Sequence, residues 1–128
     1  MASELLEQYQ KLLKKSQRIA EILCESTVPI GIITSKTIDN LCAGSILLSG
    51  LWAKGYSSHI HLVDSLRQTV DIVNETPYTH YCLLGTFKDE MNSIDQLTDK
   101  HFVVIDYRIS KEEADTIEKK EIISLSAC

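Results

Sequence analysis

Apolar residues recur every three or four positions over the first 25 residues of the chain. The stripe consists of Leu5, Leu6, Tyr9, Leu12, Leu13, Ile19, Ala20 and Leu23. This spacing predicts an amphipathic helix from Glu4 to Glu25, with Ser3 as its N-cap. Since the stripe spans only about three heptads, a coiled coil is the alternative, and we expect the helix to pack on a sheet.

Five short apolar segments follow, each bounded by polar residues or glycine. They are residues 28–34, 58–63, 81–84, 102–105 and 122–125. The first and fourth are apolar without interruption, which is typical of a parallel strand buried on both faces, whereas 58–63 alternates. We therefore expect five strands.

Helical patterns separate these segments. Residues 41–53 are apolar or small on several faces, as in a helix pressed against a sheet, and Gly55 ends this pattern. Residues 64–74 place Leu66, Val70 and Val73 on one side, and 93–97 form a short helical connection. Ser110 and Glu113 form a capping box that opens a helix over 111–120.

This alternation predicts an α/β fold in a single domain, residues 1–128. We expect a five-stranded, mostly parallel sheet over 28–125 with helices on both faces, preceded by the long amphipathic helix over 1–25. At 128 residues the chain has room for one core and not for two, so no second, substrate-binding domain is expected.

Charge and cysteine content narrow the function classes. The net charge is −5 and no basic run is present, which argues against a protein that binds nucleic acid strongly through phosphates. Cys24, Cys42, Cys82 and Cys128 form no Cys-x-x-Cys pair, so we expect reduced thiols in a cytoplasmic protein. No apolar run reaches the length of a signal peptide core or a membrane span.

Ligands of such folds bind beyond the carboxyl ends of the strands. Here these ends are residues 35–40, Gly85 with Thr86, and 106–108. No glycine-rich phosphate loop, nucleophile elbow or Ser-His-Asp order is present.

Histidine, cysteine and aspartate residues outside these motifs are further candidates for a site. His59, His61 and His80 would suit a metal if they gathered, although isolated strand histidines are more often structural. Cys42, near the start of a helix, is expected to be buried filler. Asp39 and Asp106 are expected to be solvated rather than to hold a cation.

A resemblance to the DHH phosphoesterase superfamily, in its RecJ-like branch, is carried by three segments in order. IGIITSKTIDNLCAGSILLSGLWAKGYSSHIHLVDSL resembles the family's opening strand, His-x-Asp-x-Asp-Gly motif, small-residue helix, Lys-Gly turn and second strand. YCLLGT resembles the strand that ends in Asp-x-Gly, and VVIDYR resembles Val-Ile-Asp-His-His. The resemblance covers nearly the whole chain.

This resemblance implies a site that has lost its chemistry. The family's motif positions fall on Ser35, Thr37, Asp39, Asn40, Leu83, Asp106, Tyr107 and Arg108, and its glycine is the one that falls on Asn40. Family members hold two manganese ions there, which requires several hard ligands within about 4 Å of one another. Because only two carboxylates remain, we expect no catalytic residue, no metal and no cofactor. We expect Leu83, Tyr107 and Arg108 to fill the cleft, with Arg108 near one of the aspartates.

By resemblance, the chain is a catalytically inactive DHH-domain scaffold of an archaeal replicative helicase, active in DNA replication. It would bind GINS, with MCM as a further partner, and associate with the chromosome through them. Two alternatives stay open. One is a nucleotide sensor that uses the old cleft, with Lys36 and Arg108 as phosphate contacts. The other is a residual phosphoesterase that completes its site by dimerisation.

The expected partner surface is the last strand. A sheet of order 2-1-3-4-5 leaves the second and fifth strands at its edges, and family enzymes continue beyond the fifth. The candidate interface is Ile122, Ile123, Ser124 and Leu125, a segment without proline or charge. We expect GINS, or a second copy of the chain, to pair along this edge or pack over it.

Overall fold

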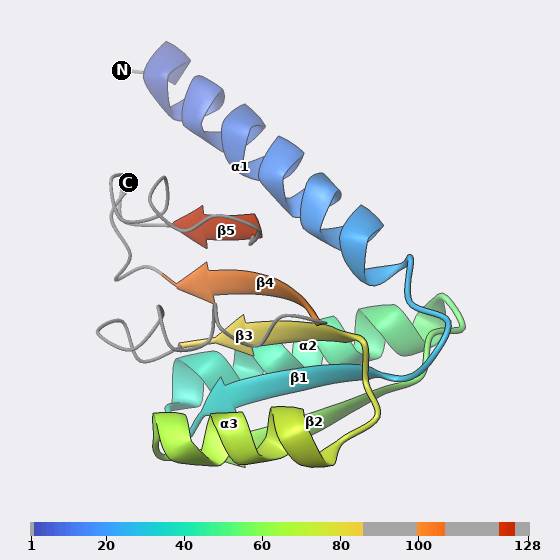
Figure 1. Ribbon diagram of the computed structural model, residues 1–128. Coiled ribbons are helices and arrows are strands. Elements are labelled where there is room, and N and C mark those ends of the chain that lie inside the picture. The colour runs from blue at the N-terminus through green and yellow to red at the C-terminus, as the bar shows by residue number, and fades with distance from the viewer. Residues whose placement is uncertain (1, 86–99, 107–120, 125–128) are drawn as a thin grey trace.

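The computed structural model describes residues 2–85, 100–106 and 121–124. Its strands form one sheet in the order β2-β1-β3-β4-β5, with every neighbouring pair parallel (Figure 1). The strands are β1 (Ile30–Ser35), β2 (Ser58–Val63), β3 (His80–Leu84), β4 (His101–Asp106) and β5 (Glu121–Ser124). The helices are α1 (Ala2–Leu23), α2 (Ile38–Ala53) and α3 (Leu66–Glu75). The predicted α/β class with a parallel sheet is confirmed.

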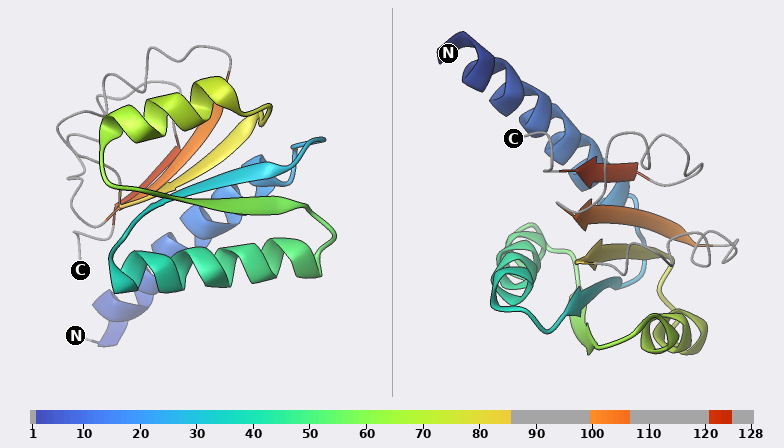
Figure 2. Two further views of the ribbon diagram at one scale, coloured as in Figure 1. Left: turned by 90° about the horizontal axis from the view of Figure 1, so that it is seen from below. Right: turned by 90° about the vertical axis from the view of Figure 1, so that its left-hand side faces the viewer.

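Helices cover both faces of the sheet (Figure 2). The end of α1 and the inner side of α2 lie on one face, and α3 lies on the other. Successive side chains of a strand point to opposite faces, so in β3 Cys82 and Leu84 join the first layer while Tyr81 and Leu83 join the second. This double coverage explains why the central strands read as continuous apolar runs.

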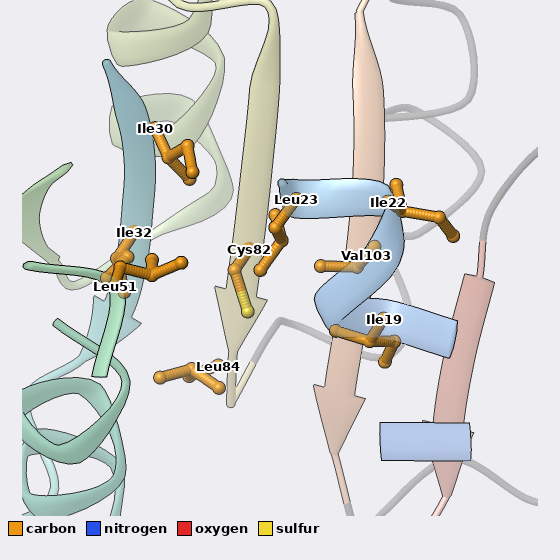
Figure 3. Close-up of a cluster of buried hydrophobic side chains, with 9 residues drawn as sticks. All are labelled: Ile19, Ile22, Leu23, Ile30, Ile32, Leu51, Cys82, Leu84 and Val103. Carbon is orange, nitrogen blue, oxygen red and sulfur yellow. The ribbon is translucent and has the colours of Figure 1, made fainter. Parts of the chain in front are cut away.

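Each face has its own hydrophobic cluster. The cluster under α1 and α2 contains Ile19, Ile22, Leu23, Ile30, Ile32, Leu51, Cys82, Leu84 and Val103 (Figure 3). The cluster under α3 contains Ile33, Val63, Val73, Tyr78, Tyr81, Leu83, Phe102 and Val104.

Side-chain caps determine where α2 and α3 begin. The Thr37 hydroxyl accepts a hydrogen bond from the Asn40 amide, so α2 begins three residues before the expected position 41. The Ser65 hydroxyl accepts from the Gln68 amide at the start of α3. Within α3, Val73 is buried as expected, but Thr69 is buried in place of Val70, which is only half-buried.

The expected packing of the whole α1 stripe on the sheet is wrong for its first half. Ile19, Ile22 and Leu23 are buried and Leu12 is partly buried, whereas the apolar residues before Leu12 are exposed. The reason is geometric: α1 reaches the sheet only with its last turns and extends past it at the other end (Figure 1).

The expectation that α2 would be pressed against the sheet holds for one side of the helix only. Gly44 and Leu51 are its buried residues, while Ile46 and Trp52 are exposed on the outer side. Cys42 also lies on the exposed side, so its expected role as buried filler is wrong.

The expected helical segments over 93–97 and 111–120 lie outside the described residues. Among the described helices, none combines the length and apolar character that a bilayer span requires.

Candidate functional site

The carboxyl ends of β1 and β3 form the centre of the candidate site. The strand order places β1 and β3 side by side, and the helices that follow β1 and β2 pack on opposite faces (Figure 2). In this strand order the chain leaves β1 toward β2 and leaves β3 toward β4. The connections therefore diverge between β1 and β3, which is where ligands bind in open α/β sheets.

Ser35, Asn40 and Gly85 fit closely together at this junction. The Asn40 Nδ2 donates a hydrogen bond of 2.7 Å to the Ser35 Oγ. Gly85, directly after β3, has φ +67°, and a Cβ there would overlap the Asn40 Nδ2 and lie 2.7 Å from the Ser35 Oγ. Two positions of the resemblance's first motif are thus bonded to each other, and the glycine backbone fills the space against them.

Thr37 and Asp39 have local roles in α2. The Thr37 hydroxyl is occupied as the N-cap. Asp39 lies in the first helical turn and is exposed, where a carboxylate interacts favourably with the helix dipole. Neither side chain is held in a buried ligand cluster.

Leu83 occupies the position of the resemblance's third-strand aspartate. Its exposed fraction is 1%, and it packs in the cluster under α3. The adjacent hollow is lined by Ile33, Ser35, Val63, Thr69, Leu83, Leu84 and Gly85. As the described residues define it, the hollow encloses about 180 Å³, a volume that includes space open to solvent.

Lys36 forms an ion pair with Asp64 across the ends of β1 and β2. The Nζ to Oδ2 distance is 2.8 Å, and both side chains are about half exposed. Such pairs add little stability, but this one gives the Lys36 ammonium a carboxylate partner. A phosphate bound by Lys36 would have to compete with that partner.

The fourth-strand part of the site is described only in its backbone. Asp106 is the last residue of β4 and pairs in register with Ser124 of β5. Tyr107 and Arg108 lie outside the described residues, so the expected filling of the cleft by Arg108 stays a prediction. In the candidate interface, Ile122, Ile123 and Ser124 belong to β5, while Leu125 lies outside the described part.

The three histidines of the sequence hypothesis do not gather. The rings of His59 and His61 lie 5.9 and 5.7 Å from that of Tyr78, and the His61 Nε2 is 3.2 Å from the Tyr78 hydroxyl. His80 stacks instead on His101, with ring centroids 4.6 Å apart. In the described part of the chain, no three His, Cys, Asp or Glu side chains are placed to hold a metal ion.

Sequence reasoning missed the stacked pair of His80 and His101. Burial lowers the pKa of the His80 imidazole, and the charge of His101 lowers it further. The His80 Nε2 is buried, and no described residue forms a hydrogen bond with it. The detectable signal was that the two histidines begin adjacent parallel strands, which places them in register.

No family model matches the sequence, and no curated protein matches it. By its geometry, the described part of the candidate site is a hydrogen-bonded and apolar junction.

Proposed function

We propose that the chain is a noncatalytic, RecJ-like DHH-domain scaffold of an archaeal replicative helicase, with GINS as its partner and MCM as a further one. The observation that carries the loss of catalysis is the burial of Leu83 in the core at the position of a family metal ligand. An aliphatic side chain cannot ligate manganese. Association through partners places the protein at the chromosome in this proposal.

The first motif supports the same proposal. Asn40 and Ser35 satisfy each other's hydrogen bonding, and Thr37 caps a helix. A two-metal hydrolase would need the side chains at the Ser35 and Thr37 positions to converge on the ions, whereas here Ser35 bonds Asn40 and Thr37 caps α2. Their engagement with one another suits a domain whose task is to keep its shape and present a surface.

The nucleotide-sensor alternative has less support. The hollow beside Leu83 is small and mostly apolar, and Lys36 is paired with Asp64. The phosphoesterase alternative would require ligands beyond those described. Two assays address these alternatives. Incubation with manganese and single-stranded DNA tests the phosphoesterase, and a thermal shift series with nucleotides tests the sensor. Release of nucleotides that Asp39→Asn abolishes would overturn the noncatalytic proposal, and stabilisation by nucleotides would favour the sensor.

The edge strand β5 is the surface proposed for GINS. It pairs with β4 on one side only in the described sheet, and an unpaired strand edge accepts a further strand through its backbone. Its neighbour α1 also contacts β5, so a partner at this edge would reach the helix as well.

Titration of purified GINS against the chain tests this surface. We expect Ser124→Lys to weaken binding at least tenfold, and Leu62→Lys, which adds the same charge at the opposite edge strand β2, to leave binding unchanged. Leu62 is a suitable control because its side chain is exposed. Unchanged affinity in a folded Ser124→Lys variant would exclude the β5 edge. Absence of binding by the unmodified chain would exclude GINS as the partner.

A further inference from the structure

The first half of α1 carries an exposed apolar patch, defined here as Leu5, Leu6, Tyr9 and Leu13. Their exposed fractions are 68%, 57%, 63% and 44%. Four large exposed apolar side chains on one side of a helix form a patch of the size that is often an interaction surface. Ser3, Gln10 and Gln17 border the patch on one side and are uncharged, so covering it desolvates no charge there.

We propose that this patch pairs two copies of the chain, with their α1 helices antiparallel and Tyr9 near the two-fold axis. In that arrangement Leu5 lies at the level of the partner's Leu13, and the reverse contact follows by symmetry. The patch is thus complementary to itself along the helix. A second copy needs no further surface feature to cover it.

The sheet decides the orientation of the two helices. Leu5, Leu12 and Ile19 lie seven residues apart and so share one side of α1, and at Ile19 that side is occupied by the sheet. A parallel partner helix that covers the Leu5 edge of the patch would run toward β3, β4 and β5 on this side. An antiparallel partner continues instead past the N-terminus of the first helix, away from the described strands.

The axial spacing leaves room for both domains. Ile19 lies ten residues from Tyr9, which is about 15 Å along the helix axis. Two-fold symmetry therefore separates the points where the two helices meet their sheets by about 30 Å, similar to the diameter of a domain this size. The pair of helices would hold the two sheets at opposite ends of a rod.

Charge distribution along α1 favours the same orientation. Acidic Glu4 and Glu7 come first and basic Lys11 and Lys14 follow. The antiparallel pair places Glu4 at the level of the partner's Lys14 and Glu7 at the level of the partner's Lys11, whereas a parallel pair would align like charges. These residues lie on the polar side of each helix, so they bias the orientation through their field and form no close ion pairs.

Light scattering after size exclusion, over a concentration series into the hundreds of micromolar, tests the dimer. The patch offers on the order of 400 Å² per partner, about half of a standard interface, so the dimer should be weak. We expect Leu6→Glu with Leu13→Glu to remove it, and Ser49→Glu with Asn74→Glu, which adds the same charge at exposed positions of α2 and α3, to retain it. Circular dichroism checks that every variant is helical.

Disulfide trapping tests the orientation. An equal mixture of the Leu5→Cys and Leu13→Cys variants should form a mixed disulfide between these positions, identified by peptide mass spectrometry, in preference to either homodimer disulfide. Three results would each overturn the proposal. The wild type could be purely monomeric, the dimer could survive the two glutamates in the patch, or disulfides could form only between two copies of Leu5→Cys. In the first case, the patch would be left for a different protein.

Discussion

Replacing Gly85 by alanine should destabilise the fold by more than backbone strain alone. Gly85 has φ +67°, and an L-residue in that region costs about 1–2 kcal/mol. The new Cβ would also displace Asn40 from Ser35, and a lost hydrogen bond costs a further ~1 kcal/mol. We expect a total of about 2–3 kcal/mol, which for a chain of this length lowers Tm by about 10 °C.

Gly55→Ala provides the matched control. Gly55 has φ +86°, but nothing lies within 4 Å of a Cβ built there. Backbone strain alone should therefore lower the free energy of unfolding of this variant, by about 1 kcal/mol. Both free energies of unfolding come from urea titrations followed by circular dichroism.

A double-mutant cycle separates the contact from the strain. Asn40→Ala alone loses the hydrogen bond to Ser35. In the double variant, the shortened side chain at position 40 leaves space for the Cβ of Gly85→Ala. The combined cost should fall short of the sum by about 1 kcal/mol. Equal costs for the Gly85 and Gly55 variants, or an additive cycle, would refute the proposed packing at the junction.

Three further predictions concern the stability of the core and its dependence on pH. Gly31→Ala should cost about 1–3 kcal/mol, because the added Cβ meets the rings of Tyr78 and Tyr81 at 2.7 and 2.9 Å; a neutral result in urea unfolding would contradict this contact. Leu83→Ala should cost about 2–5 kcal/mol as a core truncation, and Leu83→Asp should cost more without gaining manganese affinity by calorimetry; tight binding would count against the degenerate site. Burial lowers the pKa of His80 in the folded state, so the unfolded state takes up protons first as the pH falls below about 6.5. The free energy of unfolding should therefore decrease from that pH downward, and His80→Gln should flatten the decrease; an unchanged slope would exclude this histidine as its source.

Local patterns along the chain determined the strands and their alternation with helices. A buried parallel strand needs apolar residues on both faces, and β1 and β3 show this directly in their composition. The N-cap at Thr37 was missed, and only the structure shows its hydroxyl accepting from the Asn40 amide. The start of α2 was placed too late because the apolar run begins only after the polar first turn.

Tertiary structure alone decided which distant residues share the site. Asn40 bonds Ser35 within one connection, but Gly85 reaches both only because β3 pairs with β1. The separation of His61 from His80 follows from the same sheet order, since β1 lies between their strands. Periodicity predicted α1 but not how far it extends past the sheet, because an apolar stripe looks the same in sequence whether a sheet, a second helix or solvent faces it.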